Sequence, residues 1–157
     1  MNPICLHVLY ATVSGTAREI AETLALEYSD QLPGPMTVQD MHDADDALFD
    51  PAGPPLLLVV ATTGAGDLPA DALRLYQSLQ EQPRYLGALR YGLIALGDSS
   101  YGTTFCGGGH LFDATLLDMG AQRISDMLVI DAIEENDPAG LAVRWFRHWA
   151  EAAGLSK

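Results

Sequence analysis

Three short segments rich in glycine, serine and threonine carry the side chains that could do chemistry: residues 10–17, 61–69 and 96–101. Each follows an apolar run typical of a buried strand, so we expect all three at the carboxyl ends of strands. Loops in that position form the rim at which open α/β sheets bind nucleotide-like ligands. The pattern predicts one site there, in which a hydroxyl-rich loop holds a phosphate and the other two grip a flat ring.

The first of these segments has the composition of a phosphate-binding loop. Thr12, Ser14 and Thr16 offer hydroxyl groups, Gly15 allows a close backbone approach, and the helical pattern that follows supplies amide N–H groups at a helix N-terminus. No Gly-Lys-Ser/Thr sequence follows, which excludes a Walker loop, and this loop has no Gly-x-Gly-x-x-Gly fingerprint. A plain serine or threonine cap on a strand-to-helix turn is the alternative.

The other two segments offer backbone freedom and one aromatic ring. Gly64 and Gly66 permit unusual backbone angles, although Pro69 stands where the third glycine of a dinucleotide motif would fall. Tyr101 comes just past an apolar run, where its ring can stack on a flat ligand. A plain turn and a half-buried packing residue are the alternatives. Because all three loops are expected at one edge of the sheet, the sequence favours a single ligand site formed by the three together.

Short apolar runs alternate with helical spacing along the chain, and these elements position the loops. Strands are predicted at residues 3–10, 36–41, 56–62, 89–96 and 123–131, with helical stripes between them. Residues 43–55 indicate a surface loop with one helical turn. The alternation predicts an α/β fold: a three-layer sandwich with a five-stranded parallel sheet and helices on both faces. The order 2-1-3-4-5 is the natural choice for five strands, although periodicity alone does not determine it.

Length and composition agree with a single domain over residues 1–157, in which 48% of the residues are apolar. No apolar run is long enough to predict a membrane span, and no signal peptide is visible. Two scattered cysteines, Cys5 and Cys106, are typical of a reduced, cytoplasmic protein, which we expect to be monomeric.

A formal net charge of −13 argues against nucleic acid and anionic membranes as partners. It favours partners with basic faces, and solubility alone is the alternative.

Four segments together resemble the flavodoxin family, whose cofactor is FMN: residues 12–17, 62–69, 95–101 and 105–107. The resemblance spans nearly the whole chain and is nearest to the short MioC-type members, and it extends to the flavodoxin domains of sulfite and cytochrome reductases. The last strand lacks the long insertion of the large flavodoxins, which places the chain among the short ones. The resemblance implies a flavodoxin-like fold with an FMN site at the strand ends.

The resemblance also implies which residues would hold FMN. In the phosphate loop these are Thr12, Val13, Ser14, Gly15, Thr16 and Ala17, and in the ring-binding loops they are Thr62, Thr63, Gly64, Ala65, Gly97, Asp98, Tyr101, Phe105 and Cys106. Tyr101 would stack on the flavin, the Gly64 carbonyl would meet its N5, and Cys106 would offer its backbone N–H rather than its thiol. Thr63 stands where relatives usually carry Trp, Tyr or His. The loop at residues 102–104 is one residue longer than the family pattern.

A family member of this kind would be a small electron-transfer protein that shuttles electrons between a flavodoxin reductase and an acceptor enzyme. A flavin-dependent NAD(P)H:quinone or flavin reductase on the same fold is the alternative, although the chain shows no nicotinamide site. A phospho-receiver domain would need an acidic pair after the first strand, where residues 10–12 are Tyr-Ala-Thr. The four histidines have no metal-type spacing. The acidic clusters at residues 43–46 and 134–137 are expected to be solvated loops or a docking face.

Overall fold

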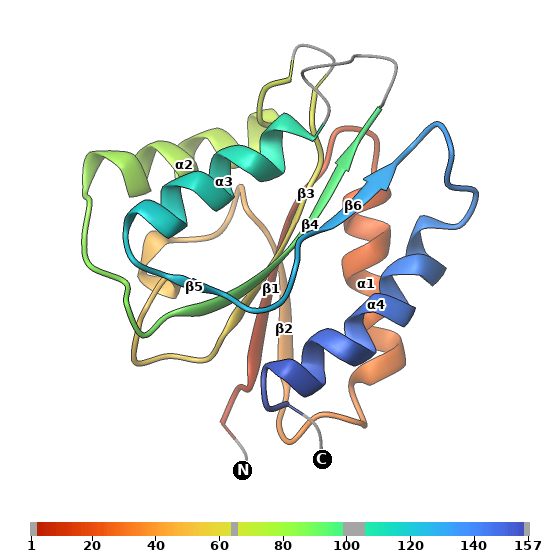
Figure 1. The fold of residues 1–157 in the computed structure, drawn as a ribbon, viewed down its shortest axis with the longest axis horizontal. Coiled ribbons are helices and arrows are strands. Elements are labelled where there is room, and N and C mark those ends of the chain that lie inside the picture. The colour runs from red at the N-terminus through yellow and green to blue at the C-terminus, as the bar shows by residue number, and fades with distance from the viewer. Residues whose placement is uncertain (1–2, 64–65, 99–105, 156–157) are drawn as a thin grey trace.

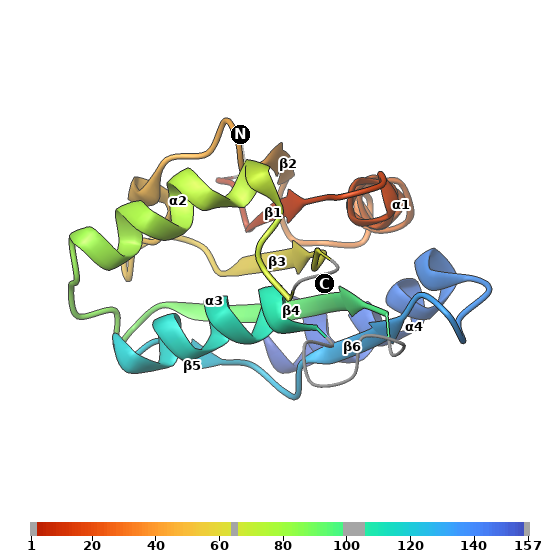
Figure 2. The same cartoon turned by 90° about the horizontal axis from the view of Figure 1, so that it is seen from above.

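All the strands of the described chain join one sheet, and every pairing in it is parallel. The structure is a computed structural model that describes residues 3–63, 66–98 and 106–155. The strands are β1 (Leu6–Ala11), β2 (Met36–Asp40), β3 (Leu56–Val60), β4 (Arg90–Gly97), β5 (Gln122–Arg123) and β6 (Leu128–Asp131). The order is β2-β1-β3-β4-β5, and β6 also pairs with β4. The predicted order 2-1-3-4-5 is therefore confirmed (Figure 2).

Helices cover both faces of this sheet and complete the predicted three-layer sandwich. Helices α1 (Thr16–Tyr28) and α4 (Pro138–Ala152) pack on one face, and α2 (Ala70–Glu81) and α3 (Gly107–Asp118) on the other, as Figures 1 and 2 show. The predicted loop between β2 and β3 contains the expected helical turn, a 3-10 helix η1 at Asp46–Leu48.

The aliphatic run of β3 explains why the molecule has a core on each side of the sheet. All five residues of β3 are buried, and successive side chains point to opposite faces. Leu56, Leu58 and Val60 join the core beneath α2 and α3. Leu57 and Val59 join the core beneath α1 and α4. A continuous run of this kind is typical of a parallel strand buried on both faces.

The last helix is fixed to the sheet by Trp149, which is fully buried. Its indole lies directly over Gly92 of β4, where a Cβ atom would overlap Trp149 Nε1. Leu141 and Trp145 are partly buried against the same core. The predicted apolar stripe is therefore the packing face of α4.

The last predicted strand, residues 123–131, is wrong as one continuous strand. Tyr91 pairs with Arg123 and Ile94 with Leu128, so three steps along β4 oppose five steps along the last segment. The two extra residues leave the ladder between β5 and β6, and Ser125 adopts a positive φ of 63° there. The apolar pattern runs through this break, because Ile124 and Met127 still pack against the two cores.

Candidate functional site

The first loop, at residues 10–17, leads into a helix N-terminus that has no side-chain cap among the described residues. Gly15 has a φ of 98°, a left-handed conformation that glycine adopts without strain. Its N–H donates to Thr12 Oγ1 over 2.7 Å, which closes the loop. The first helical bond of α1 runs from the Glu19 N–H to the Gly15 carbonyl. The amide groups at the start of α1 are therefore placed as donors for an anion.

A pocket of about 320 Å³ lies at the carboxyl ends of the central strands. It brings together parts of all three predicted loops and of a fourth segment that follows β6. Its lining consists of Thr12, Val13, Ser14, Thr16, Ala61, Thr62, Leu96, Gly97, Asp98 and Ala132. Most of the predicted site residues that the structure describes thus share one pocket at the predicted edge of the sheet.

Two predicted residues of the first loop lie outside the lining of this pocket. Gly15 lines a separate hollow along α1. The Ala17 side chain is fully buried in the core beneath α1. Gly15 and Ala17 can therefore contribute only backbone groups to a site in this pocket.

In the second loop, at residues 61–69, the neighbours Thr62 and Thr63 have different environments. The Thr62 hydroxyl accepts the Gly108 N–H over 3.1 Å and lines the pocket. Thr63 instead closes its own loop: its N–H donates to the Asp67 carbonyl, and its hydroxyl accepts the Asp67 N–H. Thr63 lines a groove beside α2 rather than the pocket. Gly64 and Ala65 lie outside the described residues.

The packing role of glycines 107–109 at the start of α3 was not predicted, although Gly107 belongs to a segment that carries the family resemblance. A Cβ on Gly107 would overlap the Gly66 carbonyl, one on Gly108 the Ala61 carbonyl, and one on Gly109 the Ala95 side chain. The run therefore allows α3 to begin in direct contact with the second loop and with β4. Three consecutive glycines at a helix start were the available signal.

Cys106 precedes α3 as its N-cap residue, with a positive φ of 57°. Its thiol is buried and lies 3.5 Å from the Ala95 carbonyl, to which it donates. Burial, and to a lesser extent the Asp131 carboxylate, raises the pKa of this thiol to about 11. The thiol is therefore protonated at neutral pH and is no nucleophile. Tyr101 and Phe105, the other residues assigned to this loop, lie outside the described residues.

Ala132 is a further lining residue that sequence reasoning missed. It follows β6, and its N–H donates to the Gly97 carbonyl over 2.8 Å. The topology could have indicated Ala132, since the carboxyl ends of all strands in a parallel sheet lie at the same edge.

The two acidic clusters are more structured than the solvated loops that we predicted. The Asp46 carboxylate accepts from Ser78 Oγ over 2.5 Å and from Arg84 over 3.0 Å. These two contacts lower the pKa of Asp46, the serine hydrogen bond most. Asp137 accepts the Gly140 N–H as the cap of α4, and Glu135 accepts the Asp137 N–H.

Neither a metal site nor a membrane span is found in the described part of the chain. No three His, Cys, Asp or Glu side chains there are grouped so that they could hold a metal ion. No helix there has the length and apolar character that crossing a bilayer requires.

Comparison with known proteins agrees with this geometry. The family model for flavodoxin matches residues 8–146. Flavodoxin YqcA of Pectobacterium carotovorum subsp. carotovorum is 50% identical over 96 residues, which cover 61% of this chain and 63% of that protein. Protein MioC of Escherichia coli (strain K12) is 33% identical over 136 residues, which cover 86% and 88% of the two chains. The match to the YqcA proteins thus spans less than two thirds of their length.

A solved structure supports the same assignment. A cysteine-to-alanine mutant of flavodoxin from Pseudomonas aeruginosa superposes with a TM-score of 0.79 at 32% identity, covering 95% of this chain and 98% of the other. The predicted resemblance is therefore confirmed. The chain belongs to the flavodoxin family, whose members bind FMN and carry electrons.

Proposed function

We propose that this chain is a small electron shuttle that carries FMN between a reductase and an acceptor enzyme. The observation that carries the proposal is the single pocket to which the first, second and third loops all contribute. Electron transfer by the bound flavin is the chemistry that FMN itself supplies, and the protein binds, orients and presents it.

The phosphate of FMN fits the first loop. Ser14 and Thr16, which carry hydroxyl groups, line the pocket, and the uncapped N-terminus of α1 offers backbone donors beside them. The partial positive charge of this helix end favours an anion although the protein as a whole has a net charge of −13. The Thr12 hydroxyl holds the loop in shape by accepting the Gly15 N–H.

The flat ring fits the part of the pocket that the other loops form. Thr62, Gly97 and Asp98 line it, and the bond from Gly108 to Thr62 fixes one of its walls. By the family resemblance, Tyr101 stacks on the ring, and Gly64, Ala65, Phe105 and the Cys106 backbone N–H complete the site. Thr63 carries no ring to contribute, and it lines a neighbouring groove.

The partners that we propose are a flavodoxin reductase and an acceptor enzyme with basic faces. Val13, at the pocket, and Ile133, next to the lining residue Ala132, are exposed apolar side chains. Glu134 and Glu135 follow directly and are acidic. An apolar contact area with acidic neighbours suits a basic partner that approaches the flavin. We further propose a monomer in the cytoplasm, where the free cysteines Cys5 and Cys106 would stay reduced.

Calorimetric titration with FMN and riboflavin tests the proposal. FMN should bind more tightly, because riboflavin leaves the donors of the first loop without a phosphate. Each lost charge-assisted hydrogen bond should cost about 1.5–3 kcal/mol. Equal affinity for the two flavins would refute the assignment of the phosphate loop. Oxidation of NADPH by the isolated protein with a quinone would point instead to a reductase.

A further inference from the structure

A long groove runs between α2 and α3, on the face of the sheet opposite α1 and α4. Its upper part, about 510 Å³, begins at Thr63 and Asp67 beside the second loop. Its lower part, about 790 Å³, reaches Tyr85 and Met119 at the far ends of the two helices. Gln80 lines both parts, so they adjoin. Figures 1 and 2 show the two helices on this common face.

Tyr76 of α2 lines the upper part of this groove and contacts α3. The Tyr76 ring packs edge-on against Phe112 with centroids 5.3 Å apart. Its hydroxyl oxygen accepts from Thr115 Oγ1 over 3.2 Å and from Gln80 Nε2 over 3.0 Å. Because the contacts with Phe112 and Thr115 join α2 to α3, the groove exists before anything binds, which lowers the free-energy cost of binding.

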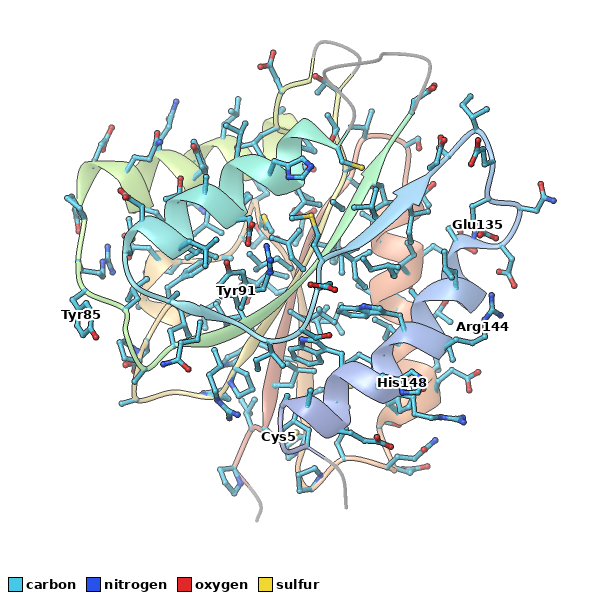
Figure 3. The ribbon with its side chains drawn as sticks, viewed as in Figure 1. Cys5, Tyr85, Tyr91, Glu135, Arg144 and His148 are labelled. Carbon is cyan, nitrogen blue, oxygen red and sulfur yellow. The ribbon has the colours of Figure 1, made fainter. Side chains whose placement is uncertain are left out.

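The upper part of the groove has partly exposed apolar walls, and the lower part is lined by polar and apolar side chains alike. Leu73 on α2 is 42% exposed and faces the groove together with Leu111 of α3. Tyr85 at the lower end is 82% exposed, and its ring lies against Gly87 and Gly120. Figure 3 shows this side chain projecting from the turn after α2. Exposed aromatic and aliphatic side chains around a hollow are typical of protein-binding surfaces.

The charge of the groove is negative. Asp67 lines its upper part and Asp118 its lower part. Of the described residues that line it, Arg84 carries the one positive charge, and that guanidinium is bound to the Asp46 carboxylate at 3.0 Å. The groove therefore favours a ligand that combines apolar side chains with positive charge.

We propose that this groove binds an amphipathic, basic helix of a protein partner. Its apolar side chains would lie between Leu73 and Leu111, and its lysines or arginines would meet Asp67 and Asp118. Since α2 has 12 residues, a helix of about 12 residues, or about 18 Å, fills the groove. The upper end of the bound helix would lie beside Thr63, in the second loop. Any role of this helix in electron transfer to or from a bound flavin rests on the proposed function.

The test uses a synthetic helical peptide as the probe, with leucines at helical spacing on one side and lysines on both flanks. The full-length protein, labelled with ¹⁵N, is titrated with this peptide at low salt. Amide shifts should change along α2 and α3. Leu73→Lys should raise the Kd at least about tenfold, because it removes an apolar contact and repels the lysines. Leu26→Lys is the matched control, since Leu26 is 83% exposed but lies on α1.

Three outcomes would overturn the proposal. The first is the absence of saturable binding, or shifts confined to α1 and α4. The second is equal binding of a peptide in which glutamates replace the lysines. The third is a dimer in analytical ultracentrifugation that Leu73→Lys dissociates, since the groove would then hold a second copy of the chain. FMN binding, followed separately by flavin fluorescence, tests the proposed function, and its failure would leave the peptide result standing.

Discussion

The Gly108 N–H donates to Thr62 Oγ1 over 3.1 Å and so joins the first turn of α3 to the loop that follows β3. The two residues are separated by 46 positions in the chain. The bond exists because Gly108 has no side chain, since a Cβ there would overlap the Ala61 carbonyl. The position of the second loop at the pocket therefore depends on the start of α3.

Thr62→Val should weaken both the fold and FMN binding. Valine keeps the shape of threonine but leaves the partly buried Gly108 N–H without an acceptor, at a cost of about 1–3 kcal/mol. Urea denaturation would measure the stability, and flavin fluorescence titration the affinity. Thr23→Val on α1 is the control, because its exposed hydroxyl donates to the Glu19 carbonyl within the same helix. Wild-type affinity in Thr62→Val would show that the bond does not hold the site.

Asp113→Asn should destabilise the fold without changing FMN affinity. Asp113 is only 9% exposed and accepts from Tyr91 Oη and from Arg123, each over 2.6 Å. Burial first, and this carboxylate second, raise the pKa of Tyr91 far above its ordinary value. Because Arg123 reaches solvent, the loss should be about 2 kcal/mol, below that of a fully buried pair. Asp118→Asn, on the same helix but exposed, should leave the urea midpoint unchanged.

His7 should make stability fall in mild acid. His7 Nδ1 lies 2.6 Å from Thr37 Oγ1, and partial burial lowers its pKa below the ordinary 6.5. Between the folded and unfolded pKa values the unfolded chain binds more protons, so stability decreases as pH falls below 6.5. Urea midpoints at several pH values should fall less steeply for His7→Gln. Identical slopes for the two proteins would assign the acid effect to other groups.

Electron transfer from a flavodoxin reductase should slow as ionic strength rises. A net charge of −13 steers a basic partner towards this protein, and salt screens that attraction over a Debye length of about 10 Å at 0.1 M. Stopped-flow measurements at low and high salt would give the rates, and photoreduction of the flavin without a partner is the control. A rate that does not change with salt would leave solubility as the role of the charge.

The sequence alone was sufficient for the fold class and for the edge of the sheet at which the pocket lies. The runs at residues 56–62 and 89–96 are apolar without interruption, which occurs where a strand is buried on both faces. Helical spacing between such runs favours parallel strands, and parallel strands bring the following loops to one edge. The location of the pocket therefore follows from local periodicity, together with the family resemblance.

Only the tertiary structure decided which side chains of those loops meet. Thr62 and Thr63 are neighbours of the same type, yet Thr62 faces the pocket and Thr63 closes its own turn. Asp46 sits in an acidic surface cluster but binds Ser78 and Arg84. The break between β5 and β6 follows from register with β4, which no local pattern encodes. The bond of Thr62 to Gly108, the contacts of Asp46 and the break after β5 all depend on segments far apart in the chain. Periodicity reports only the environment of a residue's own element.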